Sequence, residues 1–159
     1  MTSLCRSSFV LVALLAACAK TPPPPDKTQP PFATTATTKE LMADVVEPAA
    51  NVYWEAVGSI TDKNGTVELA PKTQAQWDAV RNAAIVVAES GNLLMLDGRS
   101  ANHGEWMELS RALIDVGKRA RAAAEARDRT AVFDVGAKVY QACVNCHSKY
   151  MPGVATPLP

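Results

Sequence analysis

The chain has 159 residues, of which 48% are hydrophobic and 20% are charged, and its formal net charge at pH 7 is zero. No stretch interleaves basic with aromatic residues, so we expect no nucleic-acid partner. The length suits one domain of ordinary size together with a targeting segment.

Residues 1–17 have the layout of an export signal, in which a basic residue precedes an apolar run from Phe9 to Ala17. The run is shorter than the roughly 20 apolar residues that span a bilayer. It ends in Leu15-Ala16-Ala17-Cys18, which resembles a bacterial lipobox. We therefore predict that Cys18 is lipidated and begins the mature protein, and that Cys5 is removed with the signal. A cleaved signal without lipid and an uncleaved anchor are the alternatives.

Residues 18–37 are predicted to form a lipid-anchored tether. The stretch from Lys20 to Thr38 contains six of the 11 prolines and almost no large apolar residues. Such a segment cannot bury enough surface to offset the entropy of ordering it, so an extended, semi-rigid spacer is expected. A PxxP ligand for a recognition domain is the alternative. The anchor is expected to hold the protein in the periplasm on a bacterial membrane. The residues after Cys18, Ala19 and Lys20, are not acidic, and this pattern resembles that of lipoproteins sorted to the outer membrane.

Residues 38–151 are predicted to form one all-α domain. The first helix is expected from Thr38 to about Ser59, because Thr37 and Glu40 have capping-box spacing and apolar residues recur three and four apart. Pro48 lies inside this segment and is expected to kink it, since proline removes one backbone hydrogen bond.

A loop is expected from Thr61 to Lys72, with a turn at Asn64-Gly65. Three further helices are expected, at Thr73–Leu96, at about Gly104–Ala126 and at about Thr130–Tyr150. Thr73 and Gln76 should cap the second helix, and Pro152 should end the last one, leaving residues 152–159 as a tail. No segment shows the alternation of a strand. Four amphipathic helices predict a bundle of up-down-up-down topology.

The segment from Cys143 to His147 has the pattern CxxCH, which several kinds of site share. A zinc site usually needs four ligands, whereas this chain offers one CxxC pair and two histidines, His103 and His147. A thioredoxin-type pair begins a helix, whereas Cys143 and Cys146 fall in the last turns of one. A structural disulfide is a third alternative.

In an exported chain, CxxCH is the pattern of covalent c-type haem attachment. Two residues three apart lie on one face of a helix, so both thiols can add to the vinyl groups of one haem, and the next residue places its imidazole under the iron. We therefore predict one haem c attached through Cys143 and Cys146, with His147 as the proximal iron ligand.

The distal iron ligand has to come from the part of the chain before the motif. Met151 follows His147 by one helical turn and lies on the same side of the iron, so it cannot be the opposite ligand. The candidates at the haem end of such a bundle are Met42, Met95, Met107 and His103. Met95 and Met107 are expected to wall the pocket, and His103 to cap a helix or face solvent. Met42 is then either the ligand or a packed residue beside a five-coordinate iron.

With these features the chain resembles the class II c-type cytochromes, the cytochrome c′ family, over roughly Thr38 to Tyr150. The resemblance rests on CxxCH in the last helix, on the Leu41-Met42 pair early in the first, and on the opening TKELMADVVEPAANVYW, which is similar to a low-spin branch. It implies a four-helix bundle with one haem at one end, Met42 as the distal ligand, and a chain that could form a homodimer. Where some members carry an arginine shortly before the methionine, this chain has Thr38 and Lys39.

Two basic features have functional interpretations. Arg99, in the join between the second and third helices, is predicted to contact a haem propionate, with a solvated loop residue as the alternative. The run from Gly117 to Arg129 is interrupted by Glu125 and Asp128, so we expect a solvated face, with a docking patch for an acidic redox partner as the alternative. No catalytic arrangement can be assembled from the sequence, and we do not expect an enzyme.

The sequence thus predicts a membrane-anchored cytochrome that carries single electrons between periplasmic redox proteins. Methionine opposite histidine raises the reduction potential relative to bis-histidine or five-coordinate forms. The alternative function is a five-coordinate haem protein that binds nitric oxide or carbon monoxide on an open, apolar distal side.

Overall fold

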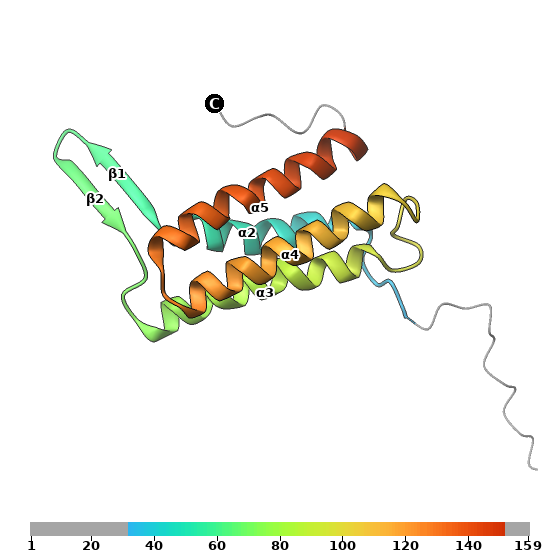
Figure 1. The fold of residues 1–159 in the computed structure, drawn as a ribbon, viewed down its shortest axis with the longest axis horizontal. Coiled ribbons are helices and arrows are strands. Elements are labelled where there is room, and N and C mark those ends of the chain that lie inside the picture. Colours follow the sequence, from blue (N-terminus) through green and yellow to red (C-terminus); the bar gives the residue numbers. More distant parts are fainter. Residues whose placement is uncertain (1–31, 152–159) are drawn as a thin grey trace, which may run out of the picture.

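The computed structural model describes residues 32–151, which are mostly helical with one small two-stranded sheet. The first helical run consists of α1 (Thr38–Leu41), the π-helical segment η1 (Met42–Val46) and α2 (Glu47–Trp54). A hairpin follows, made of β1 (Gly58–Asp62) and β2 (Gly65–Leu69). The long helices are α3 (Gln74–Leu94), α4 (Glu105–Glu125) and α5 (Arg129–Tyr150) (Figure 1). The prediction of a mainly helical domain is therefore confirmed. The signal, Cys18 and most of the tether lie outside the described residues.

The first helical run begins as predicted and then changes its hydrogen-bond pattern. Glu40 accepts a hydrogen bond from the Thr37 amide at 2.8 Å and returns one to the Thr37 hydroxyl at 3.2 Å, which confirms the capping box. Before Pro48, the amide of Glu47 donates to the carbonyl of Met42, five residues earlier. In a regular α-helix the ring of Pro48 would clash with the carbonyl of residue 44. Residue 44 lies within the wider π-helical segment.

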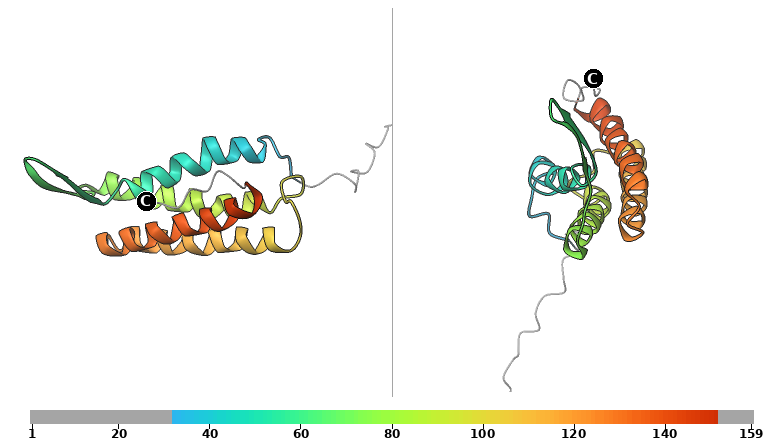
Figure 2. Two further views of the ribbon diagram at one scale, coloured as in Figure 1. Left: turned by 90° about the horizontal axis from the view of Figure 1, so that it is seen from above. Right: turned by 90° about the vertical axis from the view of Figure 1, so that its left-hand side faces the viewer.

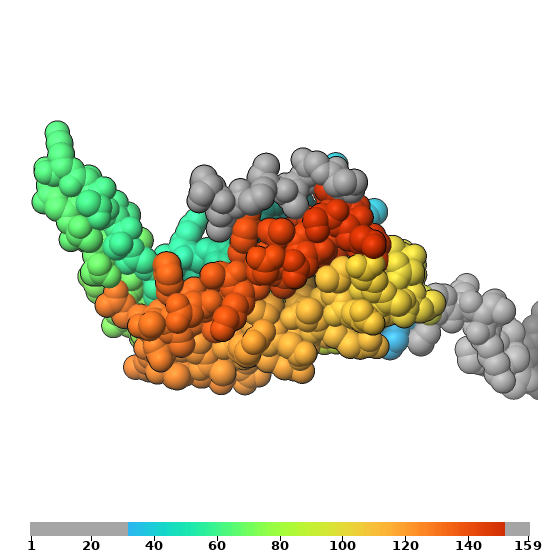
Figure 3. Space-filling view, turned by 45° about the horizontal axis from the view of Figure 1, so that its top comes forward, coloured from blue at the N-terminus to red at the C-terminus, as the bar shows by residue number. Residues whose placement is uncertain are grey.

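The region predicted to be a loop is instead a β-hairpin, so the prediction of no strands was wrong. β1 and β2 pair antiparallel from Gly58↔Leu69 to Asp62↔Gly65, around the two-residue turn Lys63-Asn64, and Gly65 directly after the turn has φ 128°. Asn-Gly is a strong hairpin signal, but the strands are short and their apolar residues do not face a core. Ile60 and Val67 oppose each other and are 57% and 63% exposed. The hairpin projects away from the helices near the start of α5 (Figure 3).

The boundaries of the three long helices lie within two residues of the predicted ones. Thr73 accepts from the Gln76 amide at 3.2 Å, which confirms the second capping box. α4 follows Gly104, whose amide donates to the Asn102 side chain at 3.0 Å. α5 begins one residue earlier than expected because Asp128 caps it by accepting from the Ala131 amide at 3.0 Å. Pro152, expected to end α5, lies outside the described residues.

Small residues bring α3 and α4 into close contact along their length (Figure 2). A Cβ added at Gly117 would lie 2.7 Å from the backbone of Ala88, and one added at Gly91 would lie 2.5 Å from the side chain of Ile114. The neighbouring buried positions Ala84 and Ala120 extend the same interface. Neither glycine position leaves room for a side chain, so the two helices approach each other more closely than larger residues would permit.

Two aromatic residues near the end of α2 attach the first helical run to the other helices. The hydroxyl of Tyr53 donates to the carbonyl of Ala120 on α4 at 3.2 Å. The indole of Trp54 donates to the carbonyl of Gly136 on α5 at 3.0 Å and packs edge-on against Tyr140, with ring centroids 6.1 Å apart. Contact between α2 and α5 is otherwise sparse, and cavities lie between them.

Candidate cofactor site

A mainly apolar cavity of about 290 Å³ is lined by the side chains that the sequence singled out as haem ligands and attachment points. The first helical run, the end of α3, the first half of α4 and the second half of α5 contribute its walls. Its lining residues are Met42, Val46, Glu47, Ala50, Asn51, Trp54, Leu94, Leu109, Ser110, Leu113, Tyr140, Ala142, Cys143, Cys146 and His147. The fold therefore places Met42 on the same cavity as the complete CxxCH motif.

The two thiols of the motif are free and partly buried on the cavity wall. Burial, together with the negative charge that Cys146 would carry, raises the pKa of Cys143 to about 11. Burial also raises the pKa of Cys146. Thiols with raised pKa values are almost entirely protonated at neutral pH, whereas a reactive redox pair needs a stabilised thiolate. This environment counts against the thioredoxin-type alternative.

His147 and Met42 line the cavity from elements that are far apart in the sequence. His147 lies in the last turns of α5 and is half-buried, and its imidazole has no hydrogen-bond partner within residues 32–151. Met42 is the first residue of η1 and is also half-buried against the core. Single π-helical turns inside α-helices occur frequently at functional sites. An imidazole and a thioether on separate elements can supply both axial ligands of a haem iron.

Contacts with the start of α4 hold the end of α5 in place. Lys149 and Glu105 form an ion pair at 2.9 Å, and the rings of Tyr150 and Trp106 meet edge-to-face with centroids 4.9 Å apart. The Asn102 amide also donates to the Tyr150 hydroxyl at 2.8 Å. These contacts fix the position of the cysteine motif relative to α4.

The other sequence candidates for the distal ligand do not line this cavity. His103 is exposed, and Asn102 performs the capping by accepting from the amides of Gly104 and Trp106 at 3.0 and 3.2 Å. Met95 and Met107 are half-buried elsewhere. The walls that these methionines were expected to provide come instead from the leucines Leu94, Leu109 and Leu113.

Arg99 makes hydrogen bonds to backbone carbonyls in the structure. Its guanidinium donates to the carbonyl of Ala36 at 2.9 and 3.2 Å and to the carbonyl of Leu93 at 3.2 Å. These bonds tie the chain entering α1 to the end of α3. The propionate contact stays a prediction, and it would have to share the guanidinium with these carbonyls.

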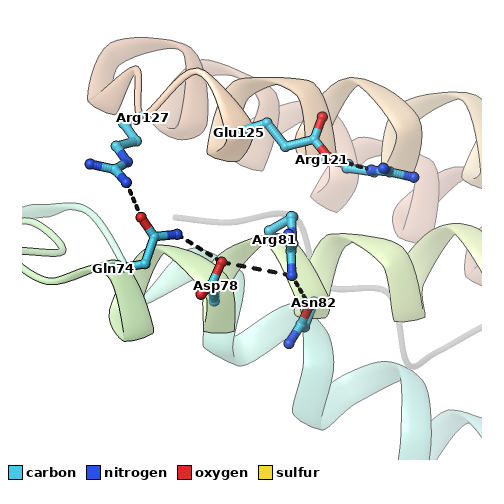
Figure 4. Close-up of polar contacts among 7 residues, drawn as sticks. All are labelled: Gln74, Asp78, Arg81, Asn82, Arg121, Glu125 and Arg127. Atoms are coloured by element: carbon cyan, nitrogen blue, oxygen red, sulfur yellow. Dashed lines mark hydrogen bonds and ion pairs between the residues drawn. The ribbon is translucent and has the colours of Figure 1, made fainter.

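Most of the basic run from Gly117 to Arg129, which covers the end of α4 and the join to α5, is engaged with neighbouring polar groups. Arg121 pairs with Glu125 at 2.7 Å, and Arg127 donates to Gln74 at the start of α3 (Figure 4). Arg129 bonds Glu68 of the hairpin at 3.0 Å. The two carboxylates, Glu125 and Glu68, partly neutralise the positive charge on this end of the molecule.

Several wall residues were not singled out from the sequence. Glu47, Asn51 and Ser110 bring polar atoms to the cavity, and Trp54 and Tyr140 separate it from a neighbouring cavity of about 400 Å³. That second cavity is almost wholly apolar and is lined by Tyr53, Trp54, Val57, Val132, Phe133, Gly136, Ala137 and Tyr140. Of these side chains, only Trp54 could have been found from the sequence, because it lies three and four positions from inward residues of α2.

Comparisons with profiles of known protein families, with curated proteins and with solved structures found no match. Within residues 32–151, no group of three or more histidine, cysteine or acidic side chains comes together to hold a bare metal ion. No helix in the same range is both long and apolar enough to cross a bilayer.

Proposed function

We propose that this protein is a c-type cytochrome that carries single electrons in the periplasm. In this proposal the helices form a four-helix up-down-up-down bundle with one haem at the end where Met42 and the CxxCH motif meet. Cys143 and Cys146 hold the haem covalently, His147 is the proximal ligand and Met42 the distal ligand. The observation that carries the proposal is the lining of one cavity by these four side chains.

The donor set of the cavity fits a c-type haem. The two thiols are three positions apart on one helix, the imidazole follows immediately, and the thioether comes from a different element. Apolar walls suit the macrocycle, since burying its faces removes hydrophobic surface from water. When bound, the haem iron supplies the one-electron change of oxidation state.

The chain's own residues would restrict the reaction at the iron to this change of oxidation state. The imidazole of His147 and the thioether of Met42 would both hold the iron and would keep water and other ligands away from it. A thioether is a soft, neutral ligand that favours ferrous over ferric iron and so raises the potential. The leucines of the cavity wall would exclude water from the ligands. Redox proteins of the periplasm would act as donor and acceptor, and the Cys18 lipid would hold the protein at a membrane.

Haem attachment tests the proposal directly. The protein is expressed with a c-type maturation system and run on a denaturing gel stained for haem. The wild-type band should keep its stain, and a variant with Cys143→Ala and Cys146→Ala should lose it. A wild-type band that never stains contradicts the proposal.

A second candidate function is binding of nitric oxide or carbon monoxide by a five-coordinate haem. The neighbouring apolar cavity of about 400 Å³ favours it, because such a space could admit a small apolar ligand. The reduced protein distinguishes the two functions. A low-spin spectrum that carbon monoxide does not change supports electron transfer, whereas a high-spin spectrum with rapid carbon monoxide binding supports the second candidate.

A further inference from the structure

Two adjacent backbone carbonyls at the end of α3 accept hydrogen bonds from side chains that follow α3 in the chain. The Leu94 carbonyl accepts from the indole of Trp106 at 2.8 Å, and the Leu93 carbonyl accepts from the guanidinium of Arg99 at 3.2 Å. Trp106 also packs edge-to-face on Tyr150, with ring centroids 4.9 Å apart. The end of α3, where Leu94 lines the candidate haem cavity, is therefore connected through Trp106 to the end of α5 that carries the cysteine motif.

Arg99 makes the corresponding connection to the first helical run. Its Nε and one terminal nitrogen donate to the carbonyl of Ala36 at 3.2 and 2.9 Å, while the other terminal nitrogen donates to Leu93. A guanidinium holds its donors in one rigid plane, so a single side chain can bridge the two carbonyls. Arg99 is half-buried, which strengthens such bonds relative to those of a fully solvated side chain.

A continuous series of backbone hydrogen bonds leads from Ala36 to Met42. Thr37 follows Ala36 and caps α1, and its carbonyl accepts from the amide of Leu41 at 2.9 Å. The amide of Met42 in turn donates to the carbonyl of Thr38. α1 buries only Leu41 and makes few contacts with the long helices. The attachment of this turn to α3 therefore depends strongly on the bridge that Arg99 makes.

Building on the proposed function, we infer that Arg99 is a positioning residue for Met42 in the haem-loaded protein. By holding the start of the first helical run at the end of α3, it keeps the thioether at the iron. A thioether is a neutral ligand, so its occupancy depends on how firmly the surrounding residues hold it. This role differs from the predicted propionate contact, because it uses the carbonyls of Ala36 and Leu93 and needs the planar donors rather than the charge alone.

Three variants of the haem-loaded protein test this inference. Arg99→Ala removes the bridge, and Arg99→Lys keeps the positive charge without the planar donors. Arg129→Ala is the control, because Arg129 also connects two elements, through Glu68 at 3.0 Å and the Leu69 carbonyl at 3.5 Å, but does not line the haem cavity. Three readouts are compared: the charge-transfer band of the ferric iron–thioether bond, the rate of carbon monoxide binding to ferrous protein, and amide hydrogen exchange over residues 37–42.

Arg99→Ala should weaken the charge-transfer band and accelerate amide exchange over residues 37–42. It should also speed carbon monoxide binding about tenfold, as expected for the loss of charge-assisted hydrogen bonds. Arg99→Lys should change the three readouts in the same direction, and Arg129→Ala should leave them at their wild-type values.

The inference is overturned if Arg99→Ala leaves the band and carbon monoxide binding unchanged, or if Arg129→Ala changes them equally. A shift in reduction potential with an unchanged band also overturns it and favours the propionate contact, as does an Arg99→Lys protein that matches wild type throughout. A wild-type protein without covalent haem would instead contradict the proposed function. Amide exchange in that protein would still show whether Arg99 holds residues 37–42.

Discussion

Met42 and His147 line the same cavity, although one lies at the start of the first helical run and the other near the end of the last helix. The two residues can approach one haem from different elements only because both ends of the domain meet at one end of the helices (Figure 1). The π-helical turn that begins at Met42 precedes Pro48, so the proline that disturbs the helix lies six residues beyond the proposed ligand.

Met42→Ala should convert a low-spin haem into a high-spin one. The variant leaves an apolar gap where the thioether was, so carbon monoxide should bind readily to the ferrous form and the potential should fall. Absorption spectra with and without carbon monoxide measure this change. Met107→Ala is the matched control, because Met107 is also half-buried but does not line the cavity. A Met42→Ala protein that stays low-spin would assign the distal position to another residue.

The apoprotein should lose stability between about pH 9 and pH 11. Burial raises the pKa of Cys143 from 9.0 to about 11 in the folded chain, so the thiol ionises more readily once the chain unfolds. Stability from the protonated thiol is fully present below pH 9 and is lost as pH rises toward 11, by about 2 to 3 kcal/mol for two pH units. Urea unfolding across this range measures it, and Cys143→Ala should flatten the dependence. The haem-loaded protein has a thioether in place of this thiol and should lack the Cys143 contribution.

Gly117→Ala should destabilise the protein more than Gly136→Ala. An added methyl group at Gly117 would meet the backbone of Ala88 at 2.7 Å, whereas at Gly136 the nearest atom is in the side chain of Trp54 at 3.3 Å. Overpacking costs about 1 to 3 kcal/mol, and the higher helix propensity of alanine offsets up to about 1 kcal/mol at each site. Thermal unfolding of the two variants gives the comparison. Equal stabilities would mean that α3 and α4 separate at little cost.

Cys18→Ser should release the protein from the membrane into the soluble periplasmic fraction. The motivation is the run Leu15-Ala16-Ala17-Cys18 in front of the proline-rich tether. Fractionation of cells, followed by haem staining of each fraction, measures the distribution. A variant that stays membrane-bound to the same extent as wild type would show that something other than a lipid on Cys18 holds the protein there.

Local sequence signals determined much of the helical framework. Thr37 with Glu40 and Thr73 with Gln76 form the predicted capping boxes, because each box needs only residues three apart. The CxxCH pattern likewise places two thiols and an imidazole on one helix without help from the rest of the chain. In contrast, the hairpin was missed because Ile60 and Val67 remain exposed, and so their strands lack the pattern that burial of one face imposes.

Only the tertiary structure decided which distant residues share a surface with the motif. Helical periodicity shows that Met42, Met95 and Met107 each lie on an apolar stripe, but it cannot show how neighbouring helices are rotated about their axes. That rotation depends on close packing at Gly91 and Gly117 and on the contacts of Tyr150 with Trp106 and Asn102. It brings Met42 and Ser110 to the cavity and leaves the other two methionines away from it. Packing between helices is a property of pairs of surfaces, and a single linear pattern does not contain it.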